Sequence, residues 1–137
     1  MSRTEPVRSE HNYCAQVPIV DVEMVTADEV SDELASRLAD AIGEALGADP
    51  GRTWVRLRLL GRHRYAESGG SVPDDVAPVF VTIAARRHPL PDDFAAVAPK
   101  VCAAVAAVTG VPSENTHVIF GADARGRVAF GGTPVSE

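Results

Sequence analysis

The chain has 137 residues, 45% of them hydrophobic and 23% charged, which predicts one soluble globular domain with a modest core. The formal net charge of −6 argues against general affinity for nucleic acid, and no apolar run is long enough to span a bilayer. We therefore expect a cytoplasmic protein with neither nucleic acid nor membrane as a partner. The two cysteines, Cys14 and Cys102, show no metal-ligand or redox spacing, and the sequence predicts no metal site.

The chain begins with a polar stretch that carries no structural periodicity. Residues 1–16 are expected to form a flexible N-terminal extension, followed by a single domain over residues 17–137. Within that domain, residues 17–25 are rich in β-branched side chains and predict a strand. Residues 53–60 alternate between aliphatic side chains and polar or aromatic ones, which predicts a second strand.

A helix is predicted between these two strands. Ser31 has the chemistry of an N-cap, and Gly47 is a natural helix end. Between them runs an apolar stripe at helical spacing, which consists of Leu34, Leu38, Ile42 and Leu46. The order of elements over residues 17–60 is therefore strand, helix, strand.

The same order returns in the second half of the chain. Residues 77–83 repeat the first strand about sixty residues later, with Pro78 as the counterpart of Pro18. A second helix is expected to begin near Ala95 or Ala96, so that Pro99 falls in its first turn, and to end at Gly110. A fourth strand over residues 116–120 follows. The self-match predicts two repeats, residues 17–70 and 77–132, each closing with a double glycine (Gly69-Gly70, Gly131-Gly132).

This pattern predicts the fold class. Two strands that flank one helix must lie parallel, joined by a right-handed crossover. The fold class is therefore α/β (α+β), with two tandem β-α-β repeats forming a four-stranded sheet and both helices on one face. The other face carries Trp54, Arg56 and Arg58 and is expected to be covered by self-association.

Several of these segments resemble the tautomerase superfamily, whose members include 4-oxalocrotonate tautomerase and macrophage migration inhibitory factor. The resemblance lies in residues 18–22 (PIVDV), the helix over residues 31–46, the Val55-Arg56-Leu57 strand and the Gly69-Gly70 pair that ends the first repeat. The doubled length resembles the fused two-repeat members, here with an N-terminal extension. The resemblance implies a homotrimer that binds a small carboxylate, a 2-oxo or unsaturated acid. It also implies an isomerase or related lyase that needs no cofactor.

Pro18 matches the proline that serves this family as its catalytic base. A free secondary amine in an apolar pocket near cations can take up a proton at neutral pH. In the intact chain, however, the Pro18 nitrogen forms an amide bond with Val17 and has no available lone pair. Pro18 is thus either a base exposed by trimming after Val17 or simply the first residue of a strand, where proline is tolerated.

The resemblance also suggests substrate-binding residues. Arg56 falls where the family places an arginine that binds and polarises the substrate. Arg86 and Arg87 follow the third strand, where fused members carry carboxylate-binding arginines, and only one of these neighbours is expected to face the pocket. Tyr65 and Phe130 lie beside the double glycines, at the family's aromatic pocket walls. The alternatives are arginines paired with surface acids and aromatic rings that only pack.

Two functions from different classes remain open. The first is an enzyme, an isomerase or related lyase in which arginines stabilise a developing enolate. The second is a catalytically inactive trimeric homologue that acts as an anion-binding or structural module. Fold alone does not choose between them.

Overall fold

The computed structural model describes residues 18–135 except residues 71 and 74, so the predicted extension over residues 1–16 lies outside the described residues. The elements follow one another in the order β1 (Ile19–Val25), α2 (Leu34–Leu46), β2 (Trp54–Leu60), η2 (Arg62–Arg64), β3 (Val79–Ala84), α3 (Pro91–Thr109), η3 (Ser113–Asn115), β4 (Thr116–Phe120), β5 (Ala129–Phe130) and β6 (Thr133–Pro134). Neither helix among these described residues is long and apolar enough to cross a bilayer.

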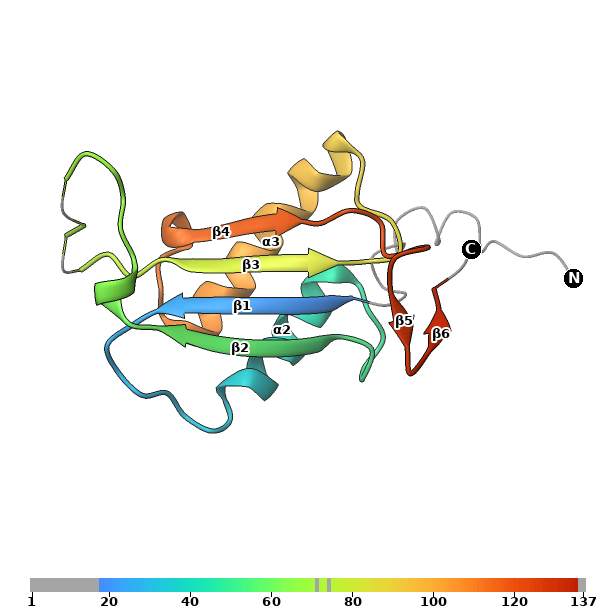
Figure 1. Ribbon diagram of the computed structural model, residues 1–137, viewed down its shortest axis with the longest axis horizontal. Coiled ribbons are helices and arrows are strands. Elements are labelled where there is room, and N and C mark those ends of the chain that lie inside the picture. Colours follow the sequence, from blue (N-terminus) through green and yellow to red (C-terminus); the bar gives the residue numbers. More distant parts are fainter. Residues whose placement is uncertain (1–17, 71, 74, 136–137) are drawn as a thin grey trace, which may run out of the picture.

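The four longer strands form one sheet in the order β2-β1-β3-β4. The pairs β1–β2 and β3–β4 are parallel, and the central pair β1–β3 is antiparallel. Helices α2 and α3 both lie behind this sheet in Figure 1, which leaves its other face open. The predicted fold class, with four strands and two helices on one face, is confirmed.

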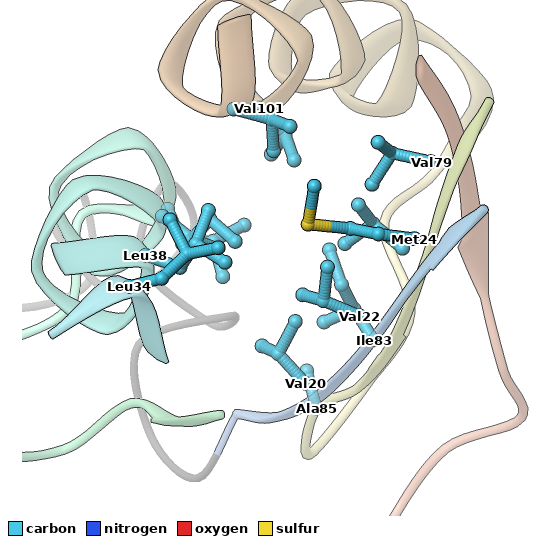
Figure 2. Packing of buried hydrophobic residues seen from close by; sticks show 13 residues of the cluster. Val20, Val22, Met24, Leu34, Leu38, Val79, Ile83, Ala85 and Val101 are labelled. Atoms are coloured by element: carbon cyan, nitrogen blue, oxygen red, sulfur yellow. The ribbon is translucent and has the colours of Figure 1, made fainter. Parts of the chain in front are cut away.

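The core lies between the sheet and the two helices. In Figure 2, side chains such as Val22 and Met24 point from the strands toward Leu38 and Val101 on the helices. The predicted stripe of α2 is buried throughout, because an apolar residue at every third or fourth position faces the sheet. The alternate residues of the strands point away from the helices and form the open face of the sheet.

The strand register corrects one detail of the predicted repeat. Ile19 pairs with Trp54 in the first unit, and Phe80 pairs with His117 in the second. Trp54 and His117 correspond at an offset of 63, so the register equivalent of Ile19 is Phe80, at an offset of 61. Val79, and not Pro78, therefore occupies the place of Pro18. The predicted offset of sixty would turn the buried side chains of β1 to the wrong face, because strand side chains alternate.

Two helix starts differ from the prediction. Helix α3 begins at Pro91, four or five residues earlier than predicted, so Pro99 lies inside it. Pro91 suits the first helical position, and Asp92 and Asp93 favour the first turn. Pro99 is exposed, so water can satisfy the backbone carbonyl that proline leaves without a hydrogen bond. Ser31 does not cap α2. Its hydroxyl accepts a hydrogen bond from the Glu33 N–H at 3.1 Å, within a turn that precedes the helix.

A small hairpin, β5–β6, was not predicted. Its two-residue loop is Gly131-Gly132, and both residues have positive φ values, of 59° and 93°, which only glycine adopts freely. Figure 1 shows the hairpin beyond the end of the sheet where β1 begins and β3 ends. The hairpin therefore borders the strand end that carries Pro18.

Candidate functional site

Pro18 lies directly before β1 and is fully buried. Its carbonyl accepts a hydrogen bond from the Trp54 N–H at 3.1 Å, which ties the beginning of β1 to the beginning of β2. Its nitrogen is acylated by Val17 in the chain as written. An acylated nitrogen cannot accept a proton, so Pro18 in this form contributes packing and backbone geometry.

Two aromatic residues gather at the same end of the sheet. Trp54 and Phe130 meet edge to face, with ring centroids 5.1 Å apart and planes at 90°. Trp54 begins β2 beside Pro18, and Phe130 comes from the β5–β6 hairpin. An edge-to-face pair of this kind stabilises the docking of the hairpin on the sheet. Trp54 remains 55% exposed, so it also presents a large apolar surface to any ligand or partner chain.

Arg86 reaches this end from β3. It follows Ala84, the register partner of Ile19, by two residues. Its backbone carbonyl accepts a hydrogen bond from the Arg125 N–H at 3.2 Å. The Arg86 side chain is half-buried, and its Nε atom is buried without a hydrogen-bond partner among the described residues. Arg87, the next residue, is exposed.

Arg56 is already engaged within the chain. It lies opposite Asp21 in the β1–β2 register, on the open face of the sheet. Its Nε and Nη2 atoms donate to the two Asp21 carboxylate oxygens at 2.7 and 2.9 Å. The hydrogen bond to Asp21, followed by the charge of Asp21, raises the pKa of Arg56. A substrate carboxylate at Arg56 would have to displace Asp21.

Tyr65 lies at the opposite end of the sheet. Its ring contacts Phe80, with centroids 6.0 Å apart, and Phe80 in turn contacts His117 at 5.3 Å. Phe80 is separated from Ala84 by four residues of extended strand, roughly 13 Å. Within one chain, Tyr65 and Pro18 therefore cannot line the same pocket. The Tyr65 hydroxyl donates to Glu67 at 2.6 Å, and this hydrogen bond is the main reason why the pKa of Tyr65 is raised.

The predicted residues thus separate into three groups. Pro18, Arg86 and Phe130 share one end of the sheet, Arg56 is paired near the middle of the open face, and Tyr65 lies at the far end. Among the described residues, no group of three or more histidine, cysteine, aspartate or glutamate side chains could hold a metal ion.

One polar pair near the Pro18 end was missed by the sequence reading. His88 and Asp123 are joined by two hydrogen bonds across 35 residues of chain. The sequence predicts Trp54 as an open-face residue but does not predict its contact with Phe130. Both contacts depend on tertiary structure. Only the two-residue Gly-Gly loop gives a local signal, because it favours a hairpin.

Comparison with known proteins rests on structure. No protein-family model matches the chain, and no curated protein sequence matches it. The macrophage migration inhibitory factor of Toxoplasma gondii superposes with a TM-score of 0.64 at 19% identity, covering 85% of this chain and 99% of that one. A fused 4-OT protein, solved as a symmetric trimer, gives a TM-score of 0.67 at 16% identity, covering 86% and 94%.

The chain has the same fold as these macrophage migration inhibitory factor and fused 4-OT structures. FG41 malonate semialdehyde decarboxylase, inhibited by 3-bromopropiolate, agrees with a TM-score of 0.63 at 14% identity, covering 82% of this chain and 88% of that chain. Identities at this level establish the fold alone. They confirm the fold expected from the sequence resemblance. The site residues that the resemblance suggests remain predictions.

Proposed function

We propose that this chain binds a small carboxylate, a 2-oxo or unsaturated acid, at the end of the sheet where Pro18 precedes β1. The observation that carries the proposal is the buried Arg86 Nε atom, which has no partner among the described residues. A buried N–H group without an acceptor costs about 1–3 kcal/mol, and more when it is charged. A carboxylate relieves that cost, because its two oxygens match the fork of a guanidinium.

The surroundings of Arg86 support this ligand class. Trp54 and Phe130 add apolar side chains at the same end of the sheet, where β1 separates Trp54 from the strand that leads into Arg86. Arg87 adds a second positive charge next to Arg86. Two proteins of similar fold were solved with small unsaturated acids or their products, Pt0534 inactivated by 2-oxo-3-pentynoate and the FG41 decarboxylase inhibited by 3-bromopropiolate.

The proposed assembly is a homotrimer in the cytoplasm, formed through the open face of the sheet. This face exposes Trp54 and Ile119, which are 55% and 49% exposed in the single chain. Exposed apolar side chains on an uncovered sheet favour self-association. A homotrimer would also allow the Tyr65 and Arg56 regions of one subunit to approach the Pro18 end of another. The fused 4-OT protein of similar fold was solved as a symmetric trimer.

Within this proposal, an active protein is an isomerase or related lyase that uses no cofactor. Arginine at the carboxylate would stabilise negative charge as it develops on an enolate. A free Pro18 amine would supply the base only in a chain that begins at Pro18. The test of this part compares the intact chain with a chain that begins at Pro18, by phenylpyruvate tautomerisation. Turnover by the shorter chain alone supports the enzyme, together with an intact-mass measurement that finds this form in the native host.

The Asp21–Arg56 pair favours a second candidate, a catalytically inactive trimer that binds an anion or acts as a structural module. Asp21 occupies two donors of Arg56, the arginine that the family resemblance assigns to substrate polarisation. Absence of turnover in both chains, with carboxylate binding retained, supports this candidate over the enzyme.

Binding itself is tested by calorimetric titration with 2-oxobutanoate, using butanone as the neutral control. We expect saturable binding of the acid and none of the ketone. Arg86→Gln removes the charge and should weaken binding at least about tenfold, the equivalent of one charge-assisted hydrogen bond. Arg37→Gln, an exposed arginine on α2, is the matched control. Equal affinity in Arg86→Gln and the unmodified chain contradicts the proposal.

A further inference from the structure

An open, shallow cavity lies on the helix-covered side of the sheet, between the start of α3 and the end of β4. It has a volume of 370 Å³ and is lined by His88, Pro89, Pro91, Phe94 and Phe120. Phe94 and Phe120 meet edge to face with centroids 5.7 Å apart, and Phe120 packs against the core. The volume is in the range of pockets that hold small organic molecules. The cavity lies on the opposite side of the sheet from the open face through which the proposed trimer forms.

His88 is the one titratable residue in the cavity lining, and Asp123 fixes its ring. One carboxylate oxygen of Asp123 accepts two hydrogen bonds, from the His88 backbone N–H at 2.9 Å and from Nδ1 at 2.8 Å. A carboxylate can only accept, so Nδ1 carries the proton in the neutral imidazole. The lone pair is then on Nε2, at the far side of the ring.

The charges around this pair keep Asp123 ionised. Hydrogen bonds from the His88 backbone and then from its side chain lower the pKa of Asp123, and the charge of Arg125 lowers it further. The other charged residues near His88 along the chain are Arg86 and Arg87 before it and Asp92 and Asp93 in the first turn of α3. An ionised carboxylate behind an imidazole stabilises the imidazolium that forms when Nε2 takes up a proton.

We propose that this cavity binds a small aromatic molecule with a weakly acidic hydroxyl group, and that His88 accepts the proton of that hydroxyl. The aromatic ring fits against Phe94 and Phe120, and the two prolines complete the apolar wall. In the transfer, the ligand O–H bond breaks and leaves its electron pair on oxygen, while an N–H bond forms at Nε2. The products are a phenolate and an imidazolium held by Asp123.

The probe is 4-nitrophenol, because its phenolate form has a separate absorbance band. We expect saturable binding of one molecule per chain and a titration midpoint of the bound probe at lower pH than that of the free probe. His88→Gln keeps a polar side chain that cannot accept the proton. It should restore the midpoint of the free probe and weaken binding at least about tenfold, as expected for loss of one charge-assisted hydrogen bond.

Phe94→Leu tests the location, since it keeps an apolar side chain in the cavity but removes an aromatic face. It should weaken binding of 4-nitrophenol while thermal unfolding stays close to that of the unmodified chain. The matched control is His63→Gln, an exposed histidine of η2 that does not line this cavity. Absence of saturable binding overturns the proposal, as does an unchanged midpoint shift in His88→Gln or an unchanged affinity in Phe94→Leu.

This inference concerns a different site from the proposed carboxylate site, and each proposal can be contradicted without the other. The probe 4-nitrophenol has no carboxylate, and 2-oxobutanoate has no aromatic ring. Loss of 2-oxobutanoate binding in Arg86→Gln therefore tests the carboxylate site alone, whereas the response to His88→Gln tests the aromatic site alone.

Discussion

Arg56 and Asp21 face each other across β1 and β2 and form a two-pronged ion pair, with nitrogen–oxygen distances of 2.7 and 2.9 Å. The Arg56 side chain remains 67% exposed, so water screens the pair. The geometry holds the Arg56 guanidinium against its cross-strand neighbour Asp21 on the open face. Arg56 therefore binds Asp21 in the single chain, and it can contact a substrate only after its hydrogen bonds to Asp21 are broken.

A double-mutant cycle measures what this pair contributes. Arg56→Ala, Asp21→Ala and the double variant should show only a small coupling free energy in urea unfolding, because exposed ion pairs are weak. The coupling should fall in high salt. Arg58 and Glu23, the next pair in register on the same face, provide a matched cycle. A coupling for Arg56 and Asp21 as large as that of a buried ion pair, and insensitive to salt, would contradict the exposed geometry.

Leu38 tests the core beneath the sheet. It is fully buried at the centre of the α2 stripe, and Leu38→Ala should lower the free energy of unfolding by about 2–5 kcal/mol, through lost burial and a residual cavity. Ser36→Ala, at an exposed position of the same helix, should change it by less than about 0.5 kcal/mol. Similar losses for both variants would mean that α2 does not pack as described.

Gly43 of α2 lies against Thr53, the residue directly before β2. A Cβ atom on Gly43 would lie 2.8 Å from Thr53 Oγ1 and 3.3 Å from Thr53 Cβ, and Thr53 is buried. Gly43→Ala should therefore lower the free energy of unfolding by about 1–2 kcal/mol through overpacking, despite the better helix propensity of alanine. Thr53→Ser, whose hydroxyl can rotate away, should reduce that loss when the two changes are combined. An increase in the free energy of unfolding for Gly43→Ala alone would contradict this prediction, because it would show that the Thr53 side chain can move away from the added Cβ atom at little cost.

These elements separate what local sequence could predict from what it could not. The α2 stripe, from Leu34 to Leu46, follows from helical periodicity, and the alternation of β2 from strand periodicity. The pairing of Arg56 with Asp21 could not be predicted from local sequence, because Asp21 is 35 residues away and only the strand register brings the two together. The same holds for His88 and Asp123. The predicted start of α3 was wrong because the favourable first turn at Pro91 outweighs the cost of Pro99 inside the helix.

Asp123 gives a pH dependence with a definite sign. Because its pKa is lower in the folded chain than in an unfolded one, the stability it contributes is present above its ordinary pKa, about 4. That stability is lost as pH falls through the lowered value. Asp123→Asn should therefore be less stable than the unmodified chain at neutral pH, and the difference should shrink in acid. A difference in urea midpoint that is constant from pH 7 to about 2 would contradict the lowered pKa.

The most direct test of the central claim observes the Arg86 guanidinium itself. In ¹H–¹⁵N NMR spectra of the intact chain, the Arg86 Nε–H resonance should move downfield and saturate as 2-oxobutanoate is added, because its buried N–H gains an acceptor. The Arg56 Nε–H resonance should stay in place, since Asp21 already occupies it. Movement of the Arg56 resonance with a stationary Arg86 resonance would contradict a carboxylate site built on Arg86.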